Sequence, residues 1–255
     1  MNPWRTSIAN SDATHIWIRG YDITELMRKT TFADLVFVLH QGRRPTTKER
    51  GLMDAILIAV ADHGAGAPSC AAARLAASGN RESLSAAVAA GLLAIGNDHG
   101  GAGSNCMEMI AAGLDRAQRE GLSIPAVARQ AVETAAAEKR LLPGLGHRVH
   151  SKDPRVDVLF DMTREAGLKG DAVAFVRELE TALREKGKAV PINVDGALAA
   201  VLHELGFAPP AGKFVFMIGR VAGLTAEVAE EYAREKPMRI RFDVEYDGVP
   251  PRKVE

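Results

Sequence analysis

Three histidines and one aspartate of this chain lie in four short segments that are rich in glycine and other small residues. The segments are residues 61–64, 97–101, 143–149 and 191–196, which carry His63, His99, His147 and Asp195, respectively. Imidazole and carboxylate groups can exchange protons near neutral pH, and glycine lets a ligand come close to the backbone. The pattern therefore predicts acid–base chemistry in a cleft between helices.

Each of these residues also has a purely structural explanation. His63 follows an apolar helix and could cap its C-terminus, and the glycines around His99 also suit a tight turn. The glycines on either side of Leu145, just before His147, are weak evidence for phosphate binding because no nucleotide motif completes them. Asp195 precedes an apolar run and could be a helix cap. Taken one at a time, none of the four decides the function.

Composition limits the class of protein. The chain has 255 residues, which suits one large domain or a large domain with a smaller one. Its 32 basic and 32 acidic residues cancel, which argues against a general nucleic-acid or membrane-surface binder but leaves room for a local basic patch. Cys70 and Cys106 lack CxxC spacing and are expected to be small core residues in a reducing compartment. With no signal-peptide pattern and no apolar run of membrane-spanning length, we expect a soluble cytoplasmic protein.

Sequence periodicity predicts a mainly helical chain with short strands at its ends. An alternating run at residues 14–20 predicts a strand or hairpin, and Asp22 opens a helix after it. Apolar runs at residues 46–62 and 81–95 predict central helices that are buried on most faces. Further helices are predicted from Asp153 through Phe160, across residues 172–183, and across residues 217–232, where Pro237 stops the last one.

The period of the pattern changes after Pro237. Ile240, Phe242, Val244 and Tyr246 alternate with charged residues, which predicts a half-buried strand in the C-terminal tail. Residues 144–151 lie between two helical blocks and are the predicted hinge.

The chemically interesting segments occur in an order that is typical of one protein family. The N-terminal part has R-G-Y-D-I-T-E-L at residues 19–26, T-F at residues 31–32 and R-P-T at residues 44–46. It is followed by D-H at residues 62–63, H-G-G-A at 99–102, G-L-G-H-R-V at 144–149 with D-P-R at 153–155, N-V-D at 193–195, and G-R at 219–220 with Gly223. In this order the chain resembles the citrate synthases over nearly its whole length.

Its departures from that family pattern point to a short branch. A long stretch of helices found in full-length citrate synthases is missing between Thr46 and Asp62, and the usual N-A-S after the first histidine is replaced by residues 64–69. The motifs D-H-G, G-L-L-A-I-G, G-H-R-V and N-V-D-G look more like those of citryl-CoA lyases, including the C-terminal module of ATP-citrate lyase.

The resemblance implies a citrate-synthase-like helical fold with a large and a small helical subdomain and short N- and C-terminal strands. Residues 1–145 and 206–255 would form the large domain, and residues 146–205 would form the small domain that carries part of the active site. The family's chemistry joins or breaks the carbon–carbon bond between the methyl carbon of acetyl-CoA and the keto carbon of oxaloacetate.

The resemblance also implies a role for each residue of the site. Asp195 would be the base at the acetyl methyl carbon, His99 would donate a hydrogen bond to the thioester oxygen, and His147 would exchange a proton with the keto oxygen. These three would be the catalytic residues. The demand is physically reasonable because a carboxylate base and a neutral imidazole donor must flank one small group in a dry site.

Other residues match the family's ligand-binding positions. The substrate carboxylates would be held by His63, Arg155 and Arg220, and by Arg239 from the neighbouring subunit. A plain surface or helix-end position is the alternative for Arg155 and Arg220, and the solvated face of the tail strand is the alternative for Arg239. Coenzyme A would meet the loop formed by Pro143, Gly144, Leu145 and Gly146, and Lys188 would meet a CoA phosphate.

The leading hypothesis is a citryl-CoA lyase that cleaves citryl-CoA to acetyl-CoA and oxaloacetate, with citrate synthase as the alternative. A catalytically silent binding paralogue and a metal-dependent hydrolase are alternatives from other classes, although no HxH, HExxH or CxxC spacing supports a metal. We expect no cofactor beyond the CoA of the substrate and no bound metal. The expected partners are a second copy of the chain, in a homodimer or a higher homo-oligomer, and a citryl-CoA synthetase, with no nucleic acid and no membrane.

Overall fold

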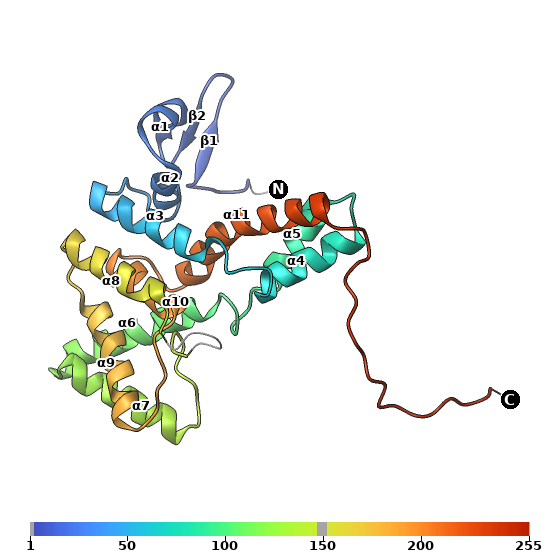
Figure 1. The fold of residues 1–255 in the computed structure, drawn as a ribbon. Helices are drawn as coiled ribbons and strands as arrows, with labels where there is room; N and C mark the ends of the chain where they lie inside the picture. Colours follow the sequence, from blue (N-terminus) through green and yellow to red (C-terminus); the bar gives the residue numbers. More distant parts are fainter. Residues whose placement is uncertain (1–2, 147–151, 255) are drawn as a thin grey trace.

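The computed structural model describes residues 3–146 and 152–254, and within them the chain is mainly helical (Figure 1). Its strands are β1 (Ala9–Ser11), β2 (Ile16–Ile18) and β3 (Tyr21–Asp22). Its helices are α1 (Ile23–Lys29), α2 (Phe32–Gln41), α3 (Thr47–Ala61), α4 (Pro68–Gly79), α5 (Leu84–Leu93), α6 (Ala102–Glu120), α7 (Ile124–Ala137), α8 (Pro154–Ala166), α9 (Asp171–Glu185), α10 (Val194–Glu204) and α11 (Ala211–Arg234). The helical fold class expected from the sequence is confirmed.

The N-terminal strands form a small antiparallel sheet in the order β1-β2-β3. Ala9 pairs with Ile18, and a turn at Gly20, where φ is +84°, returns the chain from β2 to β3. Asp22 then caps α1 by accepting hydrogen bonds from the backbone N–H groups of Thr24 and Glu25. The hairpin and helix start expected around residues 14–22 are therefore present.

The main core surrounds α10, which is almost entirely enclosed. Residues 197–202 of α10 have no exposed surface, and the helix packs against α6, α8 and α9. A second, smaller apolar cluster joins α4, α5 and α11 through residues such as Cys70, Ala87 and Leu224. In Figure 1 these three helices extend to one side of the molecule as an arm, with α11 running back into the body. Helix α11 therefore connects both clusters.

Local caps explain where several of the helices begin. Thr46 and Glu49 form a reciprocal capping box at α3, and Thr31 and Asp34 form another at α2. Asp153 caps α8, which continues to Ala166, beyond the end expected at Phe160. It ends where Gly167 adopts a left-handed conformation with φ +74°.

Two expectations about burial and strands are wrong. Helix α5 is not a central helix, because Ala87 and Gly91 are its buried residues and Leu93 is 86% exposed. Residues 86–95 contain no polar side chain that would mark a solvent face, so the sequence overstated the burial of this helix. The expected C-terminal strand over residues 240–246 is also absent: residues 239–254 form no strand, and they are almost wholly exposed. Strand formation needs a neighbouring edge, and the tail runs away from the N-terminal sheet (Figure 1).

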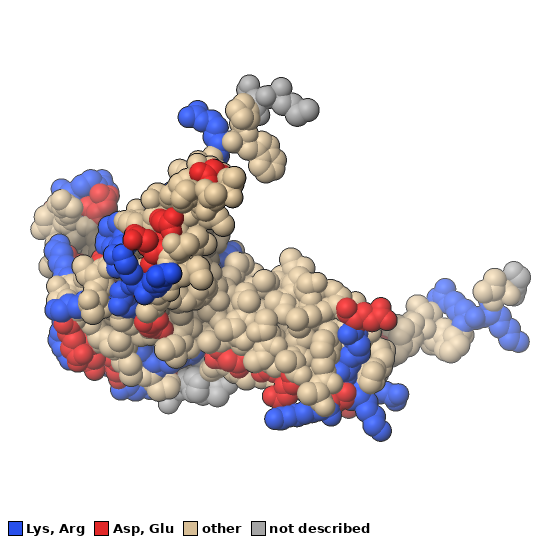
Figure 2. All heavy atoms as spheres, turned by 90° about the horizontal axis from the view of Figure 1, so that it is seen from above, with Lys and Arg blue, Asp and Glu red and all other residues tan. Residues whose placement is uncertain are grey.

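The expected division into domains stays a prediction. Helices α6 and α7, which that division assigns to the large domain, pack against α9, and α6 also packs against α10. Viewed from above, the middle of the molecule is largely uncharged, and acidic and basic side chains gather toward its two ends (Figure 2). Along the described parts of the chain, none of the helices combines the length and apolar character needed to cross a lipid bilayer.

Candidate active site

His99 lies in the loop between α5 and α6, where its ring is held by α4. The backbone groups of Gly96 and His99 bond to each other in both directions at 3.0 and 3.1 Å. The ring nitrogen Nε2 accepts the backbone N–H of Ser69 at 3.2 Å and lies 2.9 Å from the Ser69 hydroxyl. Because a backbone N–H can only donate, a neutral ring carries its proton on Nδ1. In this tautomer His99 donates hydrogen bonds through Nδ1.

Glycine gives His99 its immediate surroundings. Gly100 has φ +72°, and a Cβ atom there would lie 2.4 Å from the ring of Phe216. The Phe216 ring also packs edge-on against the His99 imidazole, with 6.1 Å between the ring centres. Only glycine fits at position 100, so the glycines beside His99 serve close packing of this loop on α11.

Arg220 of α11 is buried next to His99. It is 2% exposed, and its Nε donates to the carbonyl of Val60 at 2.9 Å, while Nη1 donates to the hydroxyl of Ser69 at 3.1 Å. The guanidinium also lies over the ring of Phe216, 4.9 Å from its centre. Ser69 thus joins Arg220 to His99, because its oxygen can accept from the guanidinium and donate to the imidazole.

Asp195 lies in the first turn of α10, and it is not the cap of that helix. The cap is Asn193, whose side-chain oxygen accepts the backbone N–H of Gly196 at 3.1 Å. The Asp195 oxygen Oδ1 is enclosed and has no hydrogen-bond partner among the described residues. Burial raises the pKa of Asp195 to about 6, opposed by the positive charges of Arg155 and Arg220. The group can therefore gain and lose a proton near neutral pH.

Arg155 reaches this region from the start of α8. Its Nε and Nη2 donate to the two carboxylate oxygens of Asp153 at 2.9 and 2.7 Å, and its Nη1 donates to the carbonyl of Ala59 at 3.0 Å. The same Asp153 carboxylate accepts the backbone N–H of Val194, the residue before Asp195, at 3.1 Å. The predicted carboxylate-binding arginine and the predicted base therefore share one buried neighbour.

The predicted CoA loop is attached directly to the start of α10. Gly144 accepts the backbone N–H of Asn193 at 3.1 Å, Gly146 donates to the carbonyl of Pro191 at 2.7 Å, and the Asn193 amide donates to Gly146 at 2.7 Å. Gly144 has φ +81°, and a Cβ there would lie 2.7 Å from both Cys106 Sγ and Gly196 Cα. The loop and the base-bearing turn are thus one tightly packed unit.

An apolar pocket opens beside this loop. Its walls include side chains from α7, α9 and the loop, and its rim carries three cationic side chains. The lining residues are Val132, Ala135, Ala136, Leu141, Leu142, Leu145, Leu183 and Val190, with Arg140, Lys186 and Lys188. Apolar walls with cations at the rim suit a ligand that has a flat hydrophobic part and phosphate groups. The structure places the predicted Lys188 and Leu145 at the same pocket.

The remaining predicted residues are His63, His147 and Arg239. His147 lies outside the described residues. His63 is in the exposed turn after α3. Arg239 follows α11 and forms ion pairs with Glu231 at 2.5 Å and with Glu235 at 3.1 Å. Glu231 is 11 residues beyond Arg220 on one helix, a separation of roughly 16 Å at 1.5 Å per residue.

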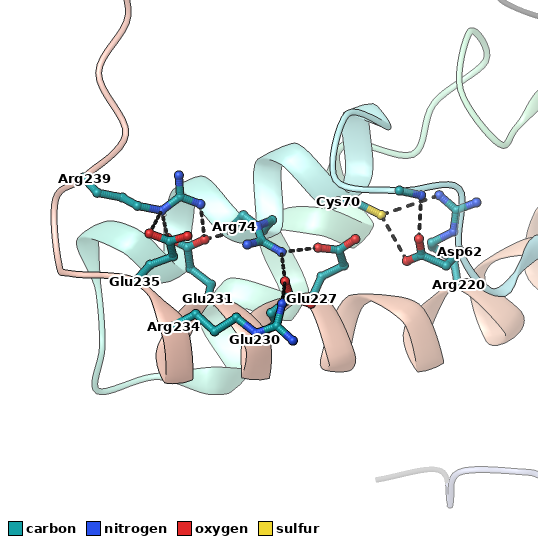
Figure 3. A network of polar contacts seen from close by, with 11 residues as sticks. Asp62, Cys70, Arg74, Arg220, Glu227, Glu230, Glu231, Arg234, Glu235 and Arg239 are labelled. Carbon is teal, nitrogen blue, oxygen red and sulfur yellow. Dashed lines mark hydrogen bonds and ion pairs between the residues drawn. The ribbon is translucent and has the colours of Figure 1, made fainter.

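Arg239 belongs to a line of charged side chains along the arm (Figure 3). Buried Glu231 binds both Arg239 and Arg74, and Arg74 also pairs with Glu227 at 2.5 Å. Through these contacts the start of the tail is fastened to α4 and α11. The predicted role of Arg239 in the active site of a neighbouring subunit stays a prediction.

Ser69, Cys106 and Asp153 are site residues that the sequence did not single out for these positions. Ser69 lies 30 residues before His99, and Cys106 lies 38 residues before the Gly144 that it contacts, so no local pattern links them. From the sequence, Asp153 is expected only as the start of a helix and as part of the D-P-R motif, and in the structure it caps α8. Its D-P-R context with Arg155 was the available signal.

One group of side chains among the described residues has the spacing of a metal site. The ligand atoms of Asp62, Cys70 and Glu227 lie within 4.8 Å of one another (Figure 3). Burial and the nearby Asp62 raise the pKa of the Cys70 thiol, and Glu227 is already paired with Arg74. This chemistry fits a metal poorly, because a metal-binding thiol must lose its proton. None of the predicted catalytic residues belongs to the group.

Known proteins match this chain in sequence and in fold. The family model described as "Citrate synthase, C-terminal domain" matches residues 47–241. The 2-methylcitrate synthase of Shewanella oneidensis is 30% identical over 225 residues, which are 87% of this chain and 56% of that protein. The chain spans about a third to just over half of the length of curated relatives such as this one.

Two solved structures give the comparison in three dimensions. The citryl-CoA lyase from Hydrogenobacter thermophilus is 38% identical with a TM-score of 0.89, and the match covers 100% of this chain and 98% of that one. The citrate synthase of Thermoplasma acidophilum, solved with carboxymethyl coenzyme A and oxaloacetate, is 25% identical with a TM-score of 0.71. That match covers 88% of this chain and 58% of that one. The chain therefore belongs to the citrate synthase family, a family of enzymes.

Proposed function

We propose that this protein is a citryl-CoA lyase, which cleaves citryl-CoA to acetyl-CoA and oxaloacetate. The observation that carries the proposal is the 38% identity to a citryl-CoA lyase over the whole length of both chains. The site supports it, because a proton-exchanging carboxyl group, an imidazole donor and two arginines converge where α3, α4, α8, α10 and α11 meet.

Cleavage needs one proton removed and another delivered. His147 takes the proton of the citryl hydroxyl as the carbon–carbon bond breaks, so that the hydroxyl oxygen becomes the keto oxygen of oxaloacetate. The electron pair of the broken bond forms the enolate of acetyl-CoA, whose oxygen accepts a hydrogen bond from Nδ1 of His99. Protonated Asp195 then gives its proton to the enolate carbon, and a pKa of about 6 suits a group that must hold and release this proton.

Arginines hold the carboxylates of the oxaloacetate portion. Arg155 and Arg220 each have guanidinium N–H groups beyond those used in the contacts described above, and a planar carboxylate matches their geometry. His63 assists from the turn after α3, and Arg239 is supplied by the neighbouring subunit. The active protein is then a homodimer or a higher homo-oligomer. The largely uncharged middle of the molecule (Figure 2) supports self-association. Exposed apolar side chains such as Ile58 and Leu93 support it as well.

The CoA portion of the substrate binds beside the loop of Pro143, Gly144, Leu145 and Gly146. The adenine enters the apolar pocket next to Leu145, and Lys188 at its rim meets a phosphate. The protein works in the cytoplasm, needs neither a metal nor a cofactor beyond the substrate's CoA, and receives citryl-CoA from a citryl-CoA synthetase.

The proposal is tested by incubating the purified chain with citryl-CoA and measuring oxaloacetate and acetyl-CoA. We expect equal amounts of both products, and we expect the activity to be unchanged after the protein is dialysed against a chelator. Asp195→Asn and His147→Ala should each lower turnover by roughly a hundredfold or more, the scale of a general acid or base. Near-normal turnover in either variant rejects the assigned role, and no turnover on any CoA thioester favours a silent paralogue.

A citrate synthase is the second candidate, favoured by the 30% identity to a 2-methylcitrate synthase. A synthase also hydrolyses the citryl-CoA thioester and releases free CoA. The chain is therefore supplied with oxaloacetate and either acetyl-CoA or propionyl-CoA, and free thiol is followed. Brisk CoA release rejects the pure lyase, and a preference for propionyl-CoA identifies the methylated product.

A further inference from the structure

The side chain of Asp153 accepts more hydrogen bonds from the proposed active site than its role as the cap of α8 requires. The residue is 1% exposed. Its Oδ1 accepts the backbone N–H of Arg155 at 3.1 Å and the Nε of the same residue at 2.9 Å. Its Oδ2 accepts Nη2 of Arg155 at 2.7 Å and the backbone N–H of Val194 at 3.1 Å. A helix cap needs only the first of these four bonds.

We propose that Asp153 is a positioning residue that fixes the substrate-binding guanidinium of Arg155 and the base-bearing first turn of α10 relative to each other. This inference rests on the proposed function. It adds a residue that would touch no substrate and would act through Arg155 and Asp195.

Geometry explains the positioning. Val194 immediately precedes Asp195, so the bond from its N–H to Asp153 sets the start of α10 and the direction in which Asp195 leaves it. The two terminal nitrogens of Arg155 are fixed as well: Nη2 donates to the Asp153 carboxylate, and Nη1 donates to the carbonyl of Ala59 in α3. A displacement of either group by about 1 Å is enough to cost a large factor in rate.

Charge couples the same groups. Among the described residues, the side chains that act electrostatically on Asp195 are Arg155 from α8, Arg220 from α11 and Asp153 before α8, and the charge of Asp195 in turn raises the pKa of the Cys106 thiol from α6. The negative charge of Asp153 raises the pKa of Asp195 and offsets part of the positive charge of Arg155. Removing that charge while keeping the shape should therefore lower the pKa of Asp195.

The decisive variant is Asp153→Asn, with Asp34→Asn as its matched control. Asp34 is also a fully buried capping aspartate, and it pairs with Arg50 at 2.7 Å between α2 and α3, away from the site residues described above. Each substitution neutralises one buried aspartate that both caps a helix and pairs with an arginine, so both should lower the melting temperature. Only Asp153→Asn should change the chemistry.

The readouts are KM, kcat and its pH profile in the cleavage direction. Cleavage uses protonated Asp195, so kcat falls as pH rises through its pKa. In Asp153→Asn this fall should occur about one pH unit lower, a tenfold change in the protonation constant, with kcat reduced and KM for citryl-CoA raised about tenfold. Asp153→Glu keeps the charge and should leave the pH of the fall unchanged while lowering kcat. A profile for Asp153→Asn that matches Asp34→Asn overturns the proposal.

A readout without turnover separates this inference from the proposed function. The carboxyl carbon of Asp195 is titrated by NMR in the wild-type protein, in Asp153→Asn and in Arg155→Gln. The expected pKa moves down in Asp153→Asn and up in Arg155→Gln, which loses the positive charge instead. If the wild-type chain fails to cleave citryl-CoA, the proposed function fails, and the titration still decides the coupling. If Asp153→Asn does not fold, an unchanged pKa of Asp195 in Arg155→Gln overturns the proposed coupling.

Discussion

At the scale of single residues, the site contains polar side chains that are buried away from water. Asp195 has an enclosed oxygen with no hydrogen-bond partner among the described residues, and its pKa is raised to about 6. Ser69 is fully buried and bonds to both His99 and Arg220. Such arrangements cost folding free energy, because a buried carboxylate has lost its water. The cost can be measured directly.

Replacing Asp195 with Asn should stabilise the protein at neutral pH. The pKa of Asp195 in the folded protein lies above the unfolded value of 3.8. As far as this group is concerned, the wild-type protein is therefore most stable below pH 4, and its free energy of unfolding falls as pH rises to about 6. Two pKa units correspond to about 3 kcal/mol. Urea unfolding at pH 7.5 should show a gain approaching this size in Asp195→Asn, disappearing near pH 4. A pH-independent difference would contradict the raised pKa.

Replacing Ser69 with Ala should weaken catalysis without a large loss of stability. The substitution removes the hydroxyl that joins Arg220 to the His99 ring, while the backbone N–H that fixes the tautomer remains. We expect kcat to fall about tenfold, the effect of losing one hydrogen bond to a charged group. Ser78→Ala is the control, because Ser78 is equally buried on α4 and its hydroxyl has no partner among the described residues. Equal kcat values in the two variants would refute this role for Ser69.

At the scale of elements, the site depends on segments that only glycine lets approach each other. The loop at Gly144 touches Cys106 of α6 and the first turn of α10. Gly170, before α9, has the same φ of +81° but no atom within 4 Å of an added Cβ. The two glycines therefore separate the cost of backbone strain from the cost of a clash.

Gly144→Ala should be far more harmful than Gly170→Ala. A left-handed alanine costs about 1–2 kcal/mol, and that is the whole effect expected at Gly170. At Gly144 the added Cβ also meets backbone atoms of Gly196, so α10 must move together with Asp195. We expect a larger drop in unfolding free energy and a loss of turnover in Gly144→Ala alone. Similar unfolding free energies in both variants would show that the loop can move aside.

At the scale of the whole molecule, the helical class and the positions of helices such as α3, α9 and α11 could be predicted from sequence, because apolar spacing and caps such as Thr46 are local signals. Contacts between distant segments could not. Ser69 meets His99 across 30 residues, and Arg220 meets Val60 across 160. The tail shows the same limit, since the alternation at Ile240–Tyr246 indicates which side chains share a face but not whether a strand edge is available.

The proposed homodimer can be tested by complementation between two inactive chains. Asp195→Asn lacks the base, and Arg239→Ala lacks the arginine that we propose enters the partner's site. Unfolding and refolding the two together should restore activity, because a mixed dimer contains one site with an intact Asp195 and an Arg239 from its partner. If Arg239 serves only its own Glu231, the mixture should be no more active than the separate chains. Light scattering should give about twice 27.2 kDa.

The three cations at the rim of the apolar pocket have a consequence for how fast substrate arrives. Arg140, Lys186 and Lys188 are exposed, and Arg140 also pairs with Glu138 and Lys186 with Glu133, which reduces their pull on an anion. The remaining attraction for a CoA phosphate extends into solvent and is screened over about 8 Å at physiological ionic strength. Added salt should therefore slow association and lower kcat/KM while leaving kcat unchanged. The enclosed Oδ1 of Asp195 is less accessible to that ionic atmosphere. Capture of the substrate and its chemistry thus respond to different properties of the surrounding solution.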